Sequence, residues 1–147
     1  MLEELKIMKL NENAVIPSRA TDGAAGLDLY ACIEEDVVVN PLETVKIPTG
    51  IAIDLCDKNL CGLVFARSGL SVNNGICLAN GVGVIDSDYK GEVIVALHNN
   101  GSEPYAIKKN QRIAQLLIMP IIYPIIKEVK SISSSKRGCG GFGSTGK

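Results

Sequence analysis

The stretch TVKIPTGIAIDL, Thr44–Leu55, decides the class of fold. Its apolar residues alternate with other residues, as they do along a β-strand with one buried face. These residues are Val45, Ile47, Ile51, Ile53 and Leu55. Pro48 interrupts the pattern and predicts a sheet edge or a kink, because proline has no N–H to donate to a neighbouring strand. The stretch therefore predicts a long, half-buried strand.

Short runs of the same kind recur on both sides of this stretch, and Pro or Gly separates most of them. They are LKIMKL, DVVV, GLVF, EVIVALHN and RIAQLLIMPIIY. By composition, RIAQLLIMPII suits a helix as well as a strand, and Pro120 favours the strand. One short helix is predicted, with Ser68 as its cap and Asn73-Asn74-Gly75 as its end. The pattern favours an all-β sandwich or barrel.

Composition narrows the function. A chain of 147 residues fits one domain, and a net charge of −1 offers no field for gripping nucleic acid or a membrane surface. The first residues lack the apolar core of a signal peptide, and Pro120 and Pro124 break the longest apolar run. Five cysteines without a C-x-x-C pair indicate reduced thiols. We therefore expect a cytoplasmic protein.

A single histidine, His98, disfavours a zinc site and a Ser-His-Asp triad.

The tail RGCGGFGSTGK, Arg137–Lys147, contains most of a P-loop motif. A P-loop lies between a strand and a helix and has a Ser or Thr directly after its lysine. In this sequence neither a helix nor a Ser or Thr follows the lysine. Two interpretations remain: a disordered glycine-rich end, or a mobile arm that folds over a ligand. The sequence from Lys130 onward has almost nothing to bury and cannot be a core strand.

Three further stretches carry candidate chemistry. In NGVGVIDSDYKGEV, Asn80–Val93, the residues Asp86–Gly91 have the pattern of a hairpin turn. Asp86 is either a turn residue or a partly buried general base at the mouth of this hairpin. In FARSGLSVNNGI, Arg67, the Ser68 hydroxyl and free backbone N–H groups are suited to an anion. In GAAGLDLYA, small residues precede Asp28 and indicate close approach of backbones.

These pieces occur together and in order. AAGLDLYA, ARSGLSVNNGI, GVIDSDYKGEV, RIAQLL and RGCGGFGSTGK resemble the five ordered motifs of the trimeric dUTPase family, from about Gly23 to Lys147. The resemblance implies a distorted jelly-roll-like β-subunit, a body over residues 1–130 and an arm over 131–147 that closes on the nucleotide. It also implies a homotrimer with active sites shared between subunits. The implied reaction is Mg²⁺-dependent hydrolysis of dUTP to dUMP and pyrophosphate, which keeps uracil out of DNA and supplies dUMP for dTMP synthesis.

The resemblance also implies a role for each matching residue. Asp86 matches the general base that activates water for attack on the α-phosphate, and Asp28 matches an acid near the water shell of the metal. The other matches bind substrate: Arg67, Ser68, Gly69 and Gln115 at the phosphates, Asn80, Gly81, Val84 and Ile85 at uracil, Tyr89 at the deoxyribose, Ile94 in the pocket wall, and Arg137, Phe142, Gly143, Ser144 and Thr145 in the arm.

Two features depart from the family pattern or carry no role in it. Ala66 stands where the family often has Pro, which removes no contacting group, and no role is assigned to Cys139. Two rival functions remain: a dCTP deaminase-like enzyme, which shares the fold, and a non-catalytic trimeric nucleotide-binding β-protein. The complete arm motif argues against the first, and the presence of Asp86 argues against the second.

Overall fold

The computed structural model describes residues 4–141 as an all-β body with one short helix. No helix in this range is long and apolar enough to cross a membrane. The elements are β1 Lys6–Lys9, β2 Leu27–Tyr30, β3 Val37–Val39, β4 Thr44–Asp54, β5 Leu60–Ala66, α1 Ser68–Asn74, β6 Ile76–Leu78, β7 Gly83–Ile85, β8 Glu92–Asn99, β9 Tyr105–Ile107 and β10 Arg112–Pro120.

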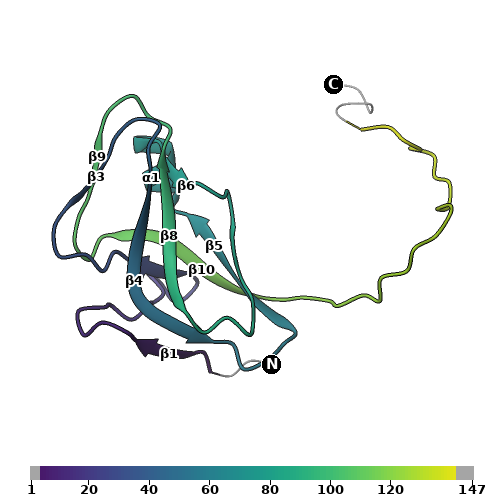
Figure 1. Cartoon of the computed structure of the whole chain (residues 1–147), viewed down its shortest axis with the longest axis horizontal. Helices are drawn as coiled ribbons and strands as arrows, with labels where there is room; N and C mark the ends of the chain where they lie inside the picture. Colours follow the sequence, from purple (N-terminus) through teal and green to yellow (C-terminus); the bar gives the residue numbers. More distant parts are fainter. Residues whose placement is uncertain (1–3, 142–147) are drawn as a thin grey trace.

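The strands form two four-stranded antiparallel sheets and a small pair. The sheet orders are β1-β4-β8-β6 and β2-β10-β5-β7, and β3 pairs with β9. Figure 1 shows β4 and β8 running side by side along the body. One apolar cluster joins buried side chains of both four-stranded sheets, among them Leu29, Ile51, Leu97 and Leu116. The architecture is thus the sandwich form of the predicted all-β fold.

The predicted alternation of buried and exposed residues holds only for the first half of β4, because residues 49–53 are all buried. Ile47, Ile51 and Ile53 are buried in β4, while Lys46 is exposed. Pro48 lies where β4 pairs with β8 but not with β1, and the register with β8 breaks immediately after it. Both parts of the prediction for Pro48, an edge and a kink, are confirmed.

The predicted strand at RIAQLLIMPII is β10, and it pairs with β2 and β5. The predicted helix is α1, but its predicted cap is wrong. Arg67 occupies the N-cap position, no side chain caps the helix, and Ser68 is the first helical residue. Gly75 ends the helix at φ 71°, where a Cβ would lie 2.5 Å from the Gly101 nitrogen. Glycine is required at this turn.

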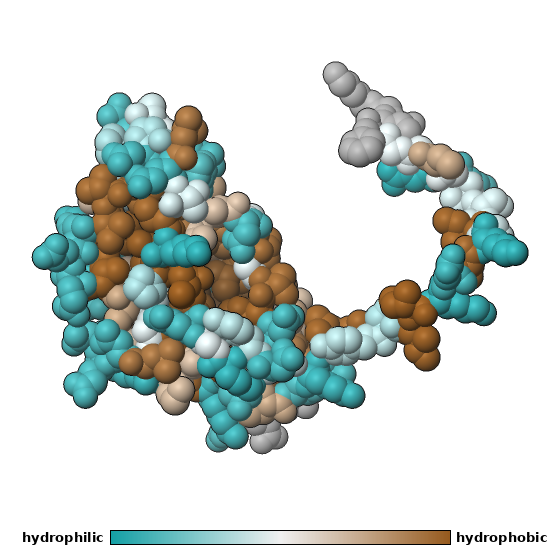
Figure 2. Space-filling model, in the orientation of Figure 1, coloured by the Kyte–Doolittle hydropathy of each residue, from teal (hydrophilic) through white to brown (hydrophobic). Residues whose placement is uncertain are grey.

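After β10 the chain leaves the body. The Ile121 N–H donates to the Asn59 carbonyl at 2.8 Å, and residues 122–139 are all exposed. Figure 1 shows this segment as an extended stretch without secondary structure that runs away from the sheets. Figure 2 shows apolar residues spaced along it, and Ile122, Ile125 and Ile126 are each at least 89% exposed. Such a run of bare isoleucines is typical of a surface that another chain covers.

Candidate active site

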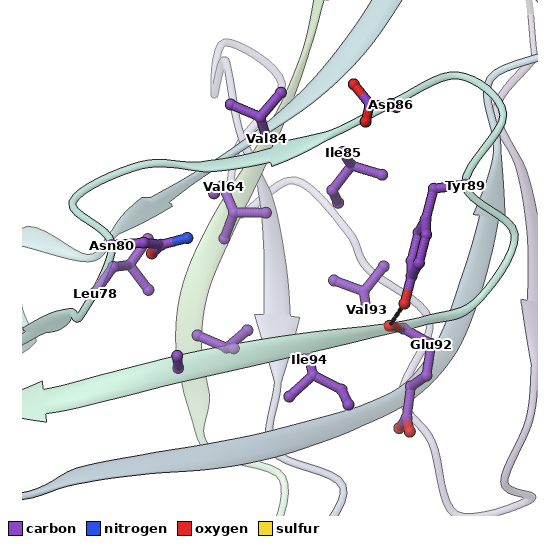
Figure 3. A pocket seen from close by; sticks show the side chains of 13 residues that line it. Val64, Leu78, Asn80, Val84, Ile85, Asp86, Tyr89, Glu92, Val93 and Ile94 are labelled. Atoms are coloured by element: carbon purple, nitrogen blue, oxygen red, sulfur yellow. Dashed lines mark hydrogen bonds between the residues drawn. The ribbon is translucent and has the colours of Figure 1, made fainter.

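A cavity of about 260 Å³ lies between β7 and β8. The residues Asp86–Gly91 connect these strands, and the sequence predicts a hairpin there. The turn forms, since the Tyr89 N–H donates to the Asp86 carbonyl at 3.2 Å. The two strands do not pair, however, because β7 joins β5 in one sheet and β8 joins β4 in the other. The gap between the diverging strands is the cavity (Figure 3).

The cavity is bordered by backbone that lacks a strand partner. β7 pairs only with β5, and β6 covers β8 only from Leu97 onward. Within residues 4–141, the β8 edge over Glu92–Val95 that faces away from β4 has no other strand against it. Free strand edges present N–H and C=O groups in fixed alternation. A planar ligand with donors and acceptors on its edge could bind there in place of a strand.

The side chains around the cavity include six of the predicted substrate and catalytic residues. These are Asn80, Val84, Ile85, Asp86, Tyr89 and Ile94. Gly81 is next to Asn80 in a tight turn at φ 71°, and its N–H donates to the Leu78 carbonyl. It shapes the turn without lining the cavity. The individual roles of the six lining residues and of Gly81 stay predictions.

Tyr89 forms one wall. Its hydroxyl donates to the Glu92 carbonyl at 2.9 Å, and Figure 3 shows its ring reaching from the turn across to β8. A Cβ on Gly91 would lie 2.5 Å from the Tyr89 hydroxyl oxygen. The ring therefore lies directly against the backbone of Gly91, and glycine is required there to admit it.

Asp86 differs from its expected environment. The sequence allowed two interpretations of Asp86, a turn residue or a partly buried base, and the burial is not found, since Asp86 is exposed. The reason is its position as the first residue after β7, on a turn that no other described element covers. Its own chain therefore does not desolvate it, although its side chain borders the cavity (Figure 3).

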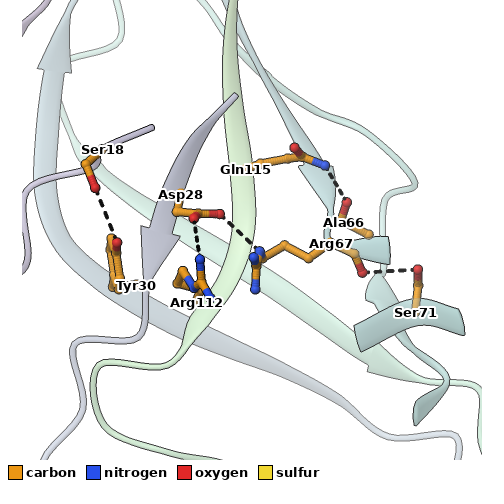
Figure 4. Close-up of polar contacts among 8 residues, drawn as sticks. All are labelled: Ser18, Asp28, Tyr30, Ala66, Arg67, Ser71, Arg112 and Gln115. Carbon is orange, nitrogen blue, oxygen red and sulfur yellow. Dashed lines mark hydrogen bonds and ion pairs between the residues drawn. The ribbon is translucent and has the colours of Figure 1, made fainter. Parts of the chain in front are cut away.

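A second site lies at the start of α1. Asp28 of β2 is only 7% exposed, and each of its carboxylate oxygens binds an arginine. Arg67 Nε lies 3.0 Å from Oδ1 and Arg112 Nη1 lies 3.2 Å from Oδ2 (Figure 4). A buried carboxylate needs such partners, because burial without them costs several kcal/mol. Asp28 thus holds Arg67 in place beside the recess.

The same recess gathers the predicted phosphate residues. It is lined by Ala20, Ala24, Ala25, Gly26, Asp28, Arg67, Ser68, Gly69 and Gln115. The Gln115 side chain donates to the Ala66 carbonyl at 3.1 Å, and a Cβ on Gly26 would lie 2.9 Å from Gln115 Oε1. Sequence reasoning missed Arg112. Its signal was faint: a charged residue that opens the strand carrying Gln115.

The described residues suit a magnesium ion that arrives on a ligand. They contain no group of three or more His, Cys, Asp or Glu that could hold a metal. Both oxygens of Asp28 already bind arginines. Mg²⁺ keeps several waters and is commonly bound through substrate phosphates, so a site with one nearby carboxylate fits it.

The arm is only partly described. Arg137 is exposed, and its Nε donates to the Gly140 carbonyl at 3.0 Å. The predicted arm residues Phe142, Gly143, Ser144 and Thr145 lie outside the described residues.

The two candidate sites lie at opposite ends of β5. Ile85 pairs with Gly62, so Asp86 lies level with Cys61 near one end of the strand, while Arg67 follows Ala66 at the other end. At the usual rise per residue this separates them by about 20 Å. A single chain therefore holds Asp86 and Arg67 well apart.

The comparisons with known proteins identify the family. The family model for dUTPase matches residues 12–146. The chain belongs to the dUTPase family. A deoxyuridine 5'-triphosphate nucleotidohydrolase of Neisseria meningitidis serogroup C is 49% identical over 143 residues, which are 97% of this chain and 95% of the relative. One of Desulfitobacterium hafniense is 50% identical over 131 residues, 89% of this chain and 87% of the relative.

Solved dUTPases share the fold. The dUTPase of Staphylococcus bacteriophage 80alpha with dUPNHPP has a TM-score of 0.88 at 30% identity and covers 98% of this chain and 99% of its own. A mutant dUTPase from phage phi11 of S. aureus, described for its coordination of a structural Mg(II) ion, has a TM-score of 0.80 at 27% identity and covers 90% of this chain and 100% of its own. The likeness spans nearly the whole dUTPase subunit.

Proposed function

We propose that this chain hydrolyses dUTP to dUMP and pyrophosphate. The observation that carries the proposal is the cavity between the free edges of β7 and β8, with Asp86 at its mouth and Tyr89 in its wall. Membership of the dUTPase family supports the same reaction. No feature of the described residues favours either rival, the dCTP deaminase-like enzyme or the non-catalytic nucleotide-binding protein.

The cavity accounts for nucleoside selectivity. Uracil presents alternating donors and acceptors, which suit the free backbone edges of Gly83–Ile85 and Glu92–Val95. A methyl group on the ring would clash with close walls such as Val84 and Ile94, and cytosine would leave backbone groups unpaired. Tyr89 lies where a 2′-hydroxyl would need room.

Asp86 is the proposed general base. It takes a proton from the water that attacks the α-phosphate, and pyrophosphate leaves. Because Asp86 is exposed in the single chain, the bound nucleotide, a second copy or the arm must exclude bulk water from it. Such exclusion strengthens each electrostatic contact in the site.

The triphosphate binds the recess of Arg67, Ser68, Gly69 and Gln115. Hydrolysis of this kind depends on positioning and charge neutralisation and needs no covalent nucleophile. Mg²⁺ bound by the phosphates would neutralise charge on the oxygens, with Asp28 near its water shell. Arg67, held by Asp28, supplies a fixed positive charge.

The active form is proposed to be a homotrimer with shared sites. The separation of about 20 Å between Asp86 and Arg67 along β5 supports a site in which the cavity of one copy meets the recess of another. The bare isoleucines of residues 122–132 favour the same arrangement, since they suit a neighbouring copy. The arm, 131–147, then closes over the nucleotide with Arg137 and Phe142. Five unpaired cysteines accord with a cytoplasmic location.

Pyrophosphate release with Mg²⁺ from dUTP, dTTP, dCTP and UTP, measured side by side, tests this function. We expect release from dUTP alone. Ammonia from dCTP would make the chain a deaminase, and no product from any of the four would leave a nucleotide-binding protein. Either result would overturn the proposal.

A further inference from the structure

The β4 strand is distorted directly behind the Tyr89 wall. Pro48 pairs with Ile94 and Ala52 pairs with Glu92, so three residues of β4 lie opposite the single residue Val93. Gly50, in the middle, has φ 68°, and a Cβ there would lie 2.8 Å from both Ala14 Cβ and Cys32 Sγ. This bulge is therefore fixed in shape and admits only glycine at its centre.

Two side chains satisfy backbone groups that the bulge takes out of the ladder. The Thr49 hydroxyl donates to the Val93 carbonyl at 2.5 Å, and Thr49 is 1% exposed. The Gly50 N–H donates to the Glu92 carboxylate at 2.8 Å. The bulge of β4 is thereby bonded to Glu92 and Val93, the first two residues of β8.

The same two residues border the nucleotide cavity. Glu92 offers its carbonyl to the Tyr89 hydroxyl on the cavity side, while Figure 3 shows its carboxylate pointing away from the cavity. Glu92 thus links Tyr89, on one side of the strand, to the bulge on the other. Movement of this peptide would move the ring.

We propose that Glu92 and Thr49 are positioning residues that set the sugar selectivity of the site. Their side chains act through the backbone and not on the substrate. They hold the Gly91–Val93 backbone so that Tyr89 leaves no room for a 2′-hydroxyl. This inference rests on the proposed function, in which Tyr89 faces the deoxyribose.

Kinetics of single variants test the positioning role. Glu92→Ala and Thr49→Val lose the two bonds, whereas Glu92→Gln and Thr49→Ser keep an acceptor and a hydroxyl. We expect the ratio of kcat/KM for dUTP to that for UTP to fall about tenfold or more in the first pair, because steric discrimination of a small group is worth about 10- to 200-fold in kcat/KM. The ratio should fall because kcat/KM for UTP rises. Glu92→Gln and Thr49→Ser should keep the ratio of the unmodified protein.

Glu35→Ala is the matched control, because Glu35 is an exposed glutamate away from both sites. Unchanged ratios in Glu92→Ala and Thr49→Val would overturn the inference. So would equal loss in the conservative pair. A general loss of activity toward both nucleotides, with the ratio preserved, would assign these residues to stability alone.

Tyr89→Phe keeps the proposal testable if a bulge variant fails to fold, since Tyr89 is 47% exposed and loses only its hydroxyl. We expect a reduced ratio, and no further reduction when Glu92→Gln or Glu92→Ala is added to it. Effects that multiply would contradict a shared route through Tyr89.

Amide NMR separates this inference from the proposed function. In Glu92→Ala the resonances of Gly50, Tyr89 and Gly91 should shift together, and in Glu92→Gln much less. If the unmodified protein hydrolyses none of the four nucleotides, the proposed function fails, while joint shifts would still support the mechanical link. Active protein without joint shifts would refute the link alone.

Discussion

At the scale of single residues, the two carboxylates of the proposed site lie in opposite environments. Asp28 is buried and binds two arginines, so it is an anchor for charge. Asp86 is exposed and binds no cation in the described part of the chain, so it is free to accept a proton. This difference supports a structural role for Asp28 and a reactive role for Asp86.

Asp86→Asn should therefore stop the reaction and leave binding intact. The amide cannot take a proton from water, and loss of a general base costs about 100- to 10,000-fold in rate. We expect kcat to fall within this range and the Kd of a non-hydrolysable dUTP analogue, measured by calorimetry, to stay within about threefold. Turnover like that of the unmodified protein would exclude Asp86 as the base.

Asp54 provides a pH prediction on the far side of the active-site turn. Lys90 bonds to both Asp54 and the Ser87 carbonyl at 2.7 Å. The hydrogen bond from Lys90, and after it that from the Cys56 N–H, lowers the pKa of Asp54 from 3.8 to about 2. A carboxylate with a lowered pKa stabilises the fold above its unfolded pKa and loses this effect as the pH falls.

The difference in unfolding free energy between the unmodified protein and Asp54→Asn should thus be constant above about pH 5 and shrink between 3.8 and about 2. Urea unfolding at fixed protein concentration measures it. The difference is small, because Asp54 is exposed and exposed ion pairs contribute little. A difference that grows toward low pH would contradict the assignment.

At the scale of elements, local patterns predicted the strands but not how they combine. Alternation identified β4, and Pro120 favoured a strand at β10. The divergence of β7 and β8 was not predictable, because the turn Asp86–Gly91 has the signature of an ordinary hairpin and the choice of sheet depends on partners far along the chain. For the same reason Arg112 was missed, since it meets Asp28 only through the pairing of β10 with β2.

Residues 122–139, after β10, are all exposed and add nothing to the core of the sheets. A chain ending at Lys136 should fold with an unchanged far-ultraviolet circular dichroism spectrum, because residues 137–141 make no contact with the sheets. Its dUTP hydrolysis should fall at least about 100-fold, since the proposed mechanism uses Arg137 and the rest of the arm to exclude water and bind phosphate.

Cys139→Ser in the full-length chain serves as the control, because Cys139 is exposed and has no assigned role. Its rate should match the unmodified protein. Full activity in the truncated chain would remove the arm from the proposed mechanism and leave it a dispensable end.

At the scale of the whole molecule, the length of β5 sets the distance between Asp86 and Arg67. Its ends carry the cavity with Asp86 and the recess with Arg67, about 20 Å apart. The sequence motifs predicted most residues of the cavity and of the recess. The distance between the two depends on the register of the strands, which no motif encodes. A symmetric oligomer is the economical way to bring the opposite ends of identical strands together.

Mixed oligomers of Asp86→Asn and Arg67→Ala test the shared site most directly. Each variant alone should be nearly inactive. Co-expressed with different affinity tags and purified through both, they should recover activity, because some sites combine an intact Asp86 from one copy with an intact Arg67 from another. In a trimer that holds both variants, one of the three sites is intact in this way, so up to about a third of the unmodified activity is expected. Mixed oligomers no more active than their parents would show that each chain builds its own site.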